Sequence, residues 1–301
     1  MFTRITTELM NNSMLQGLNQ TEQAQNDSLT QVETQRRVNV PSDDPAAAAL
    51  FTINQSAGAS ATQYLQNINS LNGRLQTGDS ALSSAVSMLN RAITLGTNGA
   101  TGTLSAQDRS VLGQEVTKLQ KQLIGVANST FQGSYIFSGT AANLPAYVAD
   151  GTQPDGVRYL GNAATNQVEV APGTQVQINL PGSSIFQNGS GSVFQALQDL
   201  KTALNSNDPA GAQTAVNEIS GALDQLSQQR VFYGTTLDRL TTTSTFLQNE
   251  QLNLTQQQTT LVGADLATAL TQLSSAETSR SAILAAAARI SPDSLINLQG
   301  P

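Results

Sequence analysis

Few side chains in this sequence are of types that carry out chemistry. The 301 residues include no cysteine and no histidine, which excludes thiolate catalysis and Cys/His zinc sites and removes the commonest general base. Asp43 and Asp44 are adjacent carboxylates, a pairing that also occurs in small metal or acid–base sites. They lie in Val40-Pro41-Ser42-Asp43-Asp44-Pro45, where an aspartate before a proline is typical of a helix N-cap followed by the first helical residue. We therefore interpret Asp44 as a cap and this segment as a turn.

Other patterns that could indicate catalysis or cofactor binding are weak. Gly189-Ser190-Gly191 stops short of a dinucleotide fingerprint, and no Gly-Lys pair exists for a phosphate-binding loop. No combination of nucleophile, base and orienting group is visible. Aromatic residues make up 4% and tryptophan is absent, which argues against an aromatic-lined ligand pocket. The sequence predicts a protein that is not an enzyme and that uses no cofactor and no metal.

Charge and hydropathy exclude two further classes of partner. The net charge is −7, and only 14 basic residues are spread over the chain, whereas a nucleic-acid-binding protein needs a clustered positive surface. No apolar run approaches the roughly 20 residues that span a bilayer. The first 20 residues lack the apolar core and the cleavage site of a signal peptide. We expect no nucleic-acid binding, no membrane insertion and, if the protein is secreted, no cleaved signal peptide.

Two long heptad patterns predict paired helices. Apolar residues alternate in steps of three and four from Ala61 to Ile93 and again from Val216 to Leu261, which is typical of a coiled-coil seam. Asn72 and Asp79 are polar positions in the first seam and are expected to fix its register. Asp208-Pro209 repeats the cap-plus-proline start of Asp44-Pro45. A break is expected at 96–102, before a helix that Ser105 caps.

The remaining segments complete a mainly α fold with a small β insert. Alternation at Val168–Val170 and Val176–Leu180 predicts strands in a β-rich outer domain. Weakly apolar terminal helices are expected at 3–36 and 262–290, the second ending at Ser291-Pro292. The predicted architecture is a long antiparallel helical rod with the β-rich domain at its tip. Its parts are an inner terminal coiled coil (1–40 and 262–301), a helical rod domain (41–139 and 192–261) and the outer domain (140–191).

Three motifs, in order along the chain, resemble the flagellin superfamily. The first is Arg37-Val38-Asn39-Val40-Pro41-Ser42-Asp43-Asp44-Pro45, whose Pro-Ser-Asp-Asp-Pro form is similar to the hook–filament junction members, since filament flagellins typically carry Ala-Lys-Asp-Asp-Ala. The second is Gly133-Ser134-Tyr135-Ile136-Phe137-Ser138-Gly139-Thr140. The third covers Asp265 to Ile290. The end of the chain departs from the family pattern, because Pro292 and a Gly-Pro tail replace an apolar terminus.

The resemblance implies a structural role outside the cell. It implies export by the flagellar type III route, assembly with copies of itself in a junction ring, and contacts with the preceding hook-associated protein and with flagellin. A cytosolic export chaperone would hold the C-terminal helix, for which we name Leu266, Leu273, Ile283 and Ile290. The subunit contact loop would comprise Arg37, Asn39, Pro41, Ser42, Asp43, Asp44 and Pro45.

Two alternative functions remain open from the sequence. A short flagellin that builds the filament itself would share the same pattern. An adhesin-like module would use the β insert as its recognition surface. For either assembly role we expect the weak terminal helices to be disordered in the monomer and to order on assembly.

Overall fold

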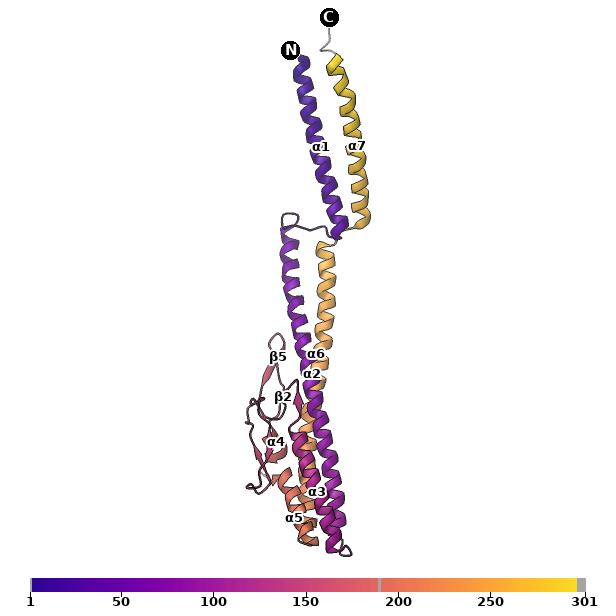
Figure 1. The fold of residues 1–301 in the computed structure, drawn as a ribbon. Coiled ribbons are helices and arrows are strands. Elements are labelled where there is room, and N and C mark those ends of the chain that lie inside the picture. The colour runs from indigo at the N-terminus through magenta and orange to yellow at the C-terminus, as the bar shows by residue number, and fades with distance from the viewer. Residues whose placement is uncertain (1, 189–190, 297–301) are drawn as a thin grey trace. The chain divides into compact units, whose positions relative to one another are not determined.

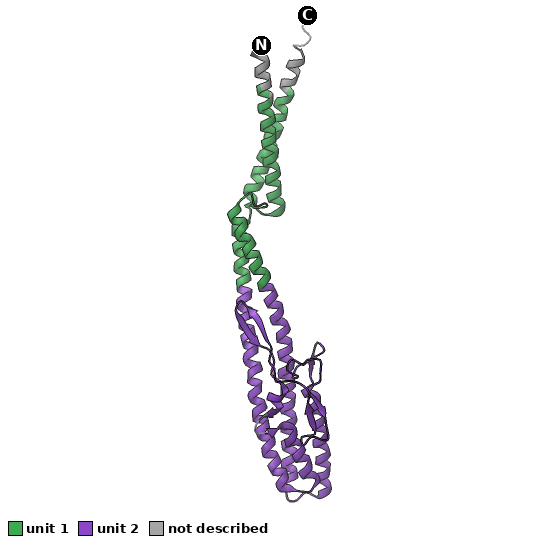
Figure 2. Cartoon of the chain, turned by 90° about the vertical axis from the view of Figure 1, so that its left-hand side faces the viewer, with its two compact units in different colours: residues 1–60, 250–301 green, residues 61–249 purple. Residues whose placement is uncertain are grey.

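The protein is described by a computed structural model covering residues 2–188 and 191–296, with side chains described for 9–10, 12–187 and 191–288. The described chain is mainly helical, with short antiparallel strand pairs between the third and fifth helices. It forms two compact units, one from residues 1–60 and 250–301 and the other from residues 61–249 (Figure 2). The expected class, mainly α with a small β insert, is confirmed. The three-part division into inner, rod and outer domains stays a prediction.

The first unit contains the two terminal helices. Helix α1 (Phe2–Thr34) packs along α7 (Leu266–Ile296) (Figure 1). The unit also holds the beginning of α2 (Pro45–Ala100) and the end of α6 (Pro209–Val262). The apolar stripe of the sequence shifts by one residue at Gly263, which predicts a break between two helices there. This break is confirmed, since α6 ends directly before Gly263. The stop predicted at Ser291-Pro292 is wrong, because a proline removes one backbone donor without ending the hydrogen bonding of the residues after it.

Four helices form the framework of the second unit. Helices α3 (Ala106–Ala127) and α5 (Val193–Asn205) pack against each other, and α2 and α6 carry the two predicted heptads. Ser105 caps α3 by accepting a hydrogen bond from the Asp108 amide, as predicted. Asp208 caps α6 at the amides of Ala210 and Gly211. Helix α2 continues to Ala100, through most of the predicted break at 96–102, because its glycines face tightly packed neighbours instead of opening a turn.

Eight short strands pair as four separate antiparallel hairpins in the described part of the second unit. The predicted strands are present as β5 (Gln167–Ala171) and β6 (Thr174–Gln177), with a bulge between Glu169 and Ala171, although the second strand ends at Gln177 and not at the predicted Leu180. Strands of two or three residues were not predicted from the sequence, because so short a run does not establish alternation. The pairs are β1 (Thr130–Phe131) with β2 (Ser134–Tyr135), β3 (Tyr147–Ala149) with β4 (Val157–Tyr159), β5 (Gln167–Ala171) with β6 (Thr174–Gln177), and β7 (Gln187–Asn188) with β8 (Gly191–Ser192); the short helix α4 (Gly182–Phe186) precedes β7.

The β segments share a core with the helices of their unit. Tyr147 of β3 has its ring centroid 4.9 Å from that of Phe194 in α5 and 5.8 Å from that of Phe186 in α4. Asn128, which follows α3, exchanges two hydrogen bonds with the Tyr147 backbone. Figure 1 shows the strands beside α2 and α3. The insert therefore lies along the helices of this unit instead of beyond their far end, where the sequence placed it.

A buried arginine closes the end of the four-helix framework. Arg109 is 4% exposed, and its guanidinium donates to the carbonyl oxygens of Gly99 (2.7 Å) and Thr101 (2.6 Å). It also donates to the side-chain oxygen of Asn207 in the turn between α5 and α6. One side chain thus joins the α2–α3 turn to the α5–α6 turn.

Candidate assembly site where residues 35–44 meet residues 259–265

The segment that follows α1 runs antiparallel to the segment that separates α6 from α7, within the first unit. Arg36 and Gly263 form an isolated β-bridge. The Arg37 amide donates to the Val262 carbonyl oxygen at 2.7 Å, and the Ala264 amide donates to the Gln35 carbonyl oxygen at 3.0 Å. Gln35 has a φ of 55°, which lets the chain leave α1 sharply. We refer to this pairing of the two linkers as the crossing.

Arg37 joins two helix ends at the crossing. Its Nη2 donates to Asp44 Oδ2 at 3.2 Å and to the Leu261 carbonyl oxygen at 3.0 Å. Asp44 immediately precedes α2, whereas Leu261 lies in the last turn of α6, where carbonyl groups have no intrahelical partner. A cation at a helix C-terminus also interacts favourably with the helix dipole. Arg37 therefore stabilises the beginning of one helix and the end of another.

The two neighbouring aspartates have different structural roles. Asp44 Oδ1 accepts the Ala47 amide at 3.0 Å, and α2 begins at Pro45, so the predicted cap is confirmed. Asp43 Oδ2 instead accepts the amides of Asn39 (2.9 Å) and Val40 (3.0 Å), which closes the Val40–Asp43 turn. Both carboxylates therefore accept hydrogen bonds from backbone amides of the turn or of the helix start.

These hydrogen bonds favour the ionised carboxylates. The backbone amides of Val40 and Asn39 hold the pKa of Asp43 below its ordinary value. The Ala47 amide, followed by the Arg37 side chain, does the same for the pKa of Asp44. Asp265 caps α7 by accepting hydrogen bonds from the amides of Thr268 and Ala267, and it also accepts one from the Thr268 hydroxyl. Together these bonds lower the pKa of Asp265 as well. All three charges therefore help to fix helix ends and turns around the crossing.

A small apolar cluster lies beneath the crossing. Val38, Ala47 and Val262 are 3%, 6% and 4% exposed, and Phe51 and Leu261 pack against them. The Arg36 guanidinium carbon lies 4.2 Å from the centroid of the Phe51 ring, a cation–π contact. The sequence did not predict Arg36 or Phe51 as members of the site. Their signal, an arginine and an aromatic residue on either side of a turn, is too common to identify them.

The predicted contact loop is thus partly structural and partly exposed. Arg37, Asn39, Asp43 and Asp44 hold the turn and the helix ends; the Asn39 side chain donates to the Arg36 carbonyl oxygen at 2.8 Å. Val40, Pro41 and Ser42 are exposed, Val40 by 50%. The structure places the seven predicted residues between the end of α1 and the first residue of α2: Arg37, Asn39, Pro41, Ser42, Asp43, Asp44 and Pro45. Their contact with another subunit stays a prediction.

The pairing of α1 and α7 leaves many apolar side chains in solvent. Among the side chains described on these two helices, only Ser28, Ala269 and Ala276 are buried. Leu9 and Leu15 on α1 are 69% and 58% exposed, and Leu270 on α7 is 52% exposed. One ion pair, Arg280 to Glu22 at 3.6 Å, crosses between the helices. So little burial contributes weakly to the stability of an isolated helix pair.

The four residues named for the chaperone have different environments. Leu266 is 40% exposed. Leu273 is half-buried, and Ile283 is half-buried near Gly17 of α1, where an added Cβ would lie 3.7 Å from Ile283 Cδ1. Ile290 lies in α7, and its side chain falls outside the described residues. A partner that binds Ile283 would therefore compete with α1, whereas Leu266 is accessible with α1 in place.

The described part of the chain shows neither a metal-binding cluster nor a membrane span. Within it, no three His, Cys, Asp or Glu side chains converge to hold a metal. Over the same residues, no helix combines the length and apolar character needed to cross a bilayer. The chemistry of the site is that of caps, turns and exposed apolar faces, which suits binding between proteins better than catalysis.

Family models and known proteins match the N-terminal and C-terminal regions of this chain. The model of the bacterial flagellin N-terminal helical region matches residues 5–142, and that of the C-terminal helical region matches residues 216–298. Flagellar hook-associated protein 3 of Escherichia coli (strain K12) is 26% identical over 286 residues, covering 87% of this chain and 89% of the relative. A flagellin of Listeria innocua is 25% identical over 253 residues, covering 82% and 83%.

Solved structures share the fold. A structure described as a putative flagellar hook-associated protein from Vibrio parahaemolyticus superposes with a TM-score of 0.68 at 22% identity, covering 73% of this chain and 99% of that one. The matched flagellin regions contain the crossing and both terminal helices, and flagellins are structural proteins, not enzymes. This chain therefore belongs to the flagellin superfamily of structural flagellar proteins, and it is similar to flagellar hook-associated protein 3 over most of its length.

Proposed function

We propose that this chain is an extracellular subunit that joins the flagellar hook to the filament. The observation that carries the proposal is the likeness to hook-associated protein 3 over 87% of this chain, which includes the Pro-Ser-Asp-Asp-Pro segment. The exposed apolar faces of α1 and α7 support an assembly role, since large exposed apolar patches mark protein interaction sites. The function would then consist of interfaces and mechanical continuity, without a catalytic step.

The proposal assigns partners to particular surfaces. Copies of the chain would form the junction ring, with the preceding hook-associated protein on one side and flagellin on the other. The loop around Val40 to Ser42 would contact a neighbouring subunit, because its exposed side chains project from a turn that the crossing holds in place. Export by the flagellar type III route, without a cleaved signal peptide, would precede assembly. A cytosolic chaperone would cover α7 until then.

A deletion strain tests the function directly. Cells that lack this chain should make hooks but release flagellin monomers into the medium, and the intact gene should restore filaments. Filaments of normal length in the deletion strain would contradict the proposal. Microscopy of the cells and gel analysis of the culture medium supply both readouts.

The contact loop has a sharper test with a matched control. Val40→Glu in the restoring gene should prevent filament attachment, because it places a charge at the proposed contact. Val111→Glu on α3 is the control, since Val111 is 53% exposed and Val40 is 50% exposed. Both purified variants should retain helical circular dichroism. Filament attachment with Val40→Glu equal to that with Val111→Glu would remove the loop from the interface.

The terminal helices supply a further test of assembly. We expect α1 and α7 to be disordered in the free monomer and to order against neighbouring subunits. Hydrogen exchange on the purified chain should be fast across residues 3–36 and slow across the seam of α2 and α6. Strong protection of residues 3–36 in the monomer would contradict this part of the proposal.

A filament-forming flagellin is the second candidate, favoured by the 25% identity with the Listeria innocua flagellin. Purified subunits that grow spontaneously into long filaments would support it over the junction role. The adhesin hypothesis has less support, because Tyr147 and Phe186 of the insert share a core with α5. Surface substitutions in the insert, rather than its deletion, would test it through cell attachment with motility unchanged.

A further inference from the structure

Helices α2 and α6 bury apolar side chains at a constant interval in the second unit. Seven residues separate each of these seam positions from the next. Sliding one helix along the other by seven residues, about 10 Å, would return apolar side chains to apolar positions. Apolar burial alone therefore discriminates poorly between registers. The positions are Ala61, Ile68, Leu75, Leu82 and Leu89 on α2, and Ile219, Leu226, Tyr233, Leu240 and Leu247 on α6.

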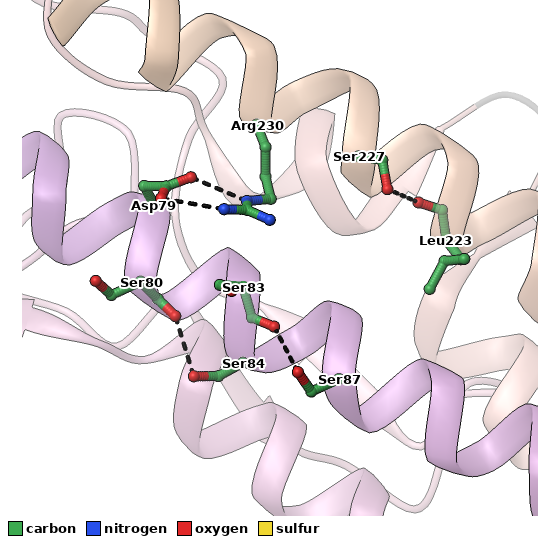
Figure 3. Close-up of polar contacts among 8 residues, drawn as sticks. All are labelled: Asp79, Ser80, Ser83, Ser84, Ser87, Leu223, Ser227 and Arg230. Atoms are coloured by element: carbon green, nitrogen blue, oxygen red, sulfur yellow. Dashed lines mark hydrogen bonds and ion pairs between the residues drawn. The ribbon is translucent and has the colours of Figure 1, made fainter.

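One level of this seam carries a charged pair. Arg230 Nε donates to Asp79 Oδ1 at 2.9 Å, and Arg230 Nη2 donates to Asp79 Oδ2 at 3.1 Å, as Figure 3 shows. Each side chain is 35% exposed, so the pair lies at the edge of the apolar seam. Two parallel bonds fix the planar guanidinium against the planar carboxylate, which gives the contact a defined geometry. We call Asp79 and Arg230 the register pair.

The largest side chain of the seam lies beside the register pair. Tyr233 is fully buried, and an added Cβ on Gly78 would lie 2.5 Å from its Cε1. Tyr233 therefore fits in this position because the facing residue has no side chain. A buried tyrosine ring has little room to move aside in a close-packed seam.

A slip of one heptad would disrupt both features. Arg230 would then lie level with Asn72 or Val86, and Asp79 would lie level with Leu223 or Leu237. The same slip would place Tyr233 level with Leu71 or Ala85, each of which has a Cβ where Gly78 has none. Leaving a charge unpaired against an apolar seam is costly, and specifying register is the best-attested role of such polar pairs.

We propose that the register pair, with the Gly78–Tyr233 contact, selects the single register in which α2 and α6 pair. A second close contact marks the same register nearer the end of the helices, where an added Cβ on Gly96 would lie 2.4 Å from Val216 Cγ2. The question for experiment is whether that contact suffices without the register pair. The proposal concerns the purified chain and does not depend on the junction function.

Spin labels on α2 and α6 measure the register directly. The chain has no cysteine, so Gln63→Cys with Thr235→Cys would introduce the only two labelling sites. Both positions are exposed, and both lie on the side of the register pair away from Gly96. Their axial separation is about 20 Å in the observed register, and a heptad slip would change it by about 10 Å. Pulsed electron resonance on the labelled full-length chain resolves such a difference.

The test variant makes the seam uniform. Asp79→Leu, Arg230→Leu and Tyr233→Leu replace the register pair and the aromatic ring with the residue that dominates the rest of the seam. Replacing an ion pair by apolar residues is often tolerated. We therefore expect helical circular dichroism to persist while a second label distance appears, shifted by about 10 Å. Should the triple variant lose its helical signal, Asp79→Leu with Arg230→Leu gives the same comparison with Tyr233 retained.

Two controls distinguish register from general stability. The reversed pair, Asp79→Arg with Arg230→Asp, should keep the single native distance. Arg91→Leu with Glu115→Leu removes a comparable ion pair between α2 and α3, outside the seam, and should also keep it. A single unchanged distance in the uniform variant would overturn the proposal, because Gly96 and Val216 would then suffice. A second distance in either control would overturn it as well.

Discussion

Arg37 and Asp44 form an ion pair at 3.2 Å, and the same Arg37 nitrogen also reaches the Leu261 carbonyl oxygen at 3.0 Å. The arginine is therefore shared between the residue that caps α2 and the last turn of α6. Since 224 positions separate Arg37 from Leu261 in the chain, this contact ties the two halves of the sequence together in the first unit. Its consequences can be tested without knowing the assembly partners.

Replacing Arg37 should loosen the crossing without unfolding the helices. Arg37→Ala removes both side-chain contacts, so the amides of Arg37 and Ala264 should exchange with solvent a few times faster. Arg37→Lys should give an intermediate rate, because an ammonium group cannot reproduce the guanidinium geometry. Hydrogen exchange read by NMR gives the rates. Lys121→Ala, an exposed change in α3, is the control, and equal exchange in Arg37→Ala and in that control would contradict the assigned role.

Acid should weaken the same region through its aspartates. Asp43, Asp44 and Asp265 have pKa values below their ordinary value, so each contributes stability above its unfolded pKa, about 4. That contribution is lost as the pH falls through the folded pKa, when the carboxylates take up protons. We expect the protection of the amides at the crossing, which is the slowing of their exchange relative to that of the unfolded chain at the same pH, to fall below about pH 4, before any comparable change in the second unit. Titration of the carboxyl carbons by NMR locates the transition.

Asparagine variants supply the control for this pH effect. Asparagine is also a good N-cap but carries no charge. Asp44→Asn and Asp265→Asn should therefore retain the helix starts at neutral pH while flattening the pH dependence at the crossing. An unchanged acid transition in the double variant would show that other carboxylates cause it.

Local signals in the sequence identified most elements correctly. Asp44-Pro45, Asp208-Pro209 and Ser105 marked helix starts, because caps depend on residues within one turn of each other. The paired heptads were visible because a period of seven over many turns is specific. The sequence also named the loop that forms half of the crossing. It did not reveal the other half, the carbonyl groups of Leu261 and Val262, since every residue carries a carbonyl.

Contacts between residues that are far apart in the sequence could not be predicted from sequence patterns. Asp79 was recognised as a polar position in a seam, but its pairing with Arg230, 151 residues further along the chain, depends on the register of two helices. Gly96 and Gly99 indicated a helix break, yet they lie inside α2, since their missing side chains admit Val216 and Leu204. Glycine has two uses, in turns and in close packing, and only the three-dimensional neighbours distinguish them.

The buried Arg109 should be one of the most sensitive positions of the second unit. Arg109→Met leaves the carbonyl groups of Gly99 and Thr101 without their donor, and we expect a loss of about 3 kcal/mol in the free energy of unfolding. Arg109→Lys should recover little of it, because lysine cannot bond three acceptors in a planar fork. Urea denaturation followed by circular dichroism measures the loss. Lys118→Met, an exposed change on the same helix, should alter stability by less than about 0.5 kcal/mol.

Two glycine-to-alanine changes in helices should have opposite effects. In α2, a Cβ added to Gly96 would lie 2.4 Å from Val216 Cγ2 and 3.0 Å from Leu200 Cδ1. Gly221 in α6 has nothing within 4 Å of such an atom. Alanine is favoured over glycine in a helix by about 1 kcal/mol, so Gly221→Ala should raise the free energy of unfolding by up to that amount.

At Gly96 the cost of packing an added methyl group should outweigh the helical preference for alanine over glycine. Forcing an extra methyl group into a well-packed core costs about 1–3 kcal/mol, and Val216 is a β-branched residue with little freedom to turn away. Gly96→Ala should therefore lower the free energy of unfolding by about 1 kcal/mol. Parallel urea titrations of the two variants give the sign of each change. Stabilisation by Gly96→Ala would show that α2 and α6 are less closely packed at this level than the structure describes.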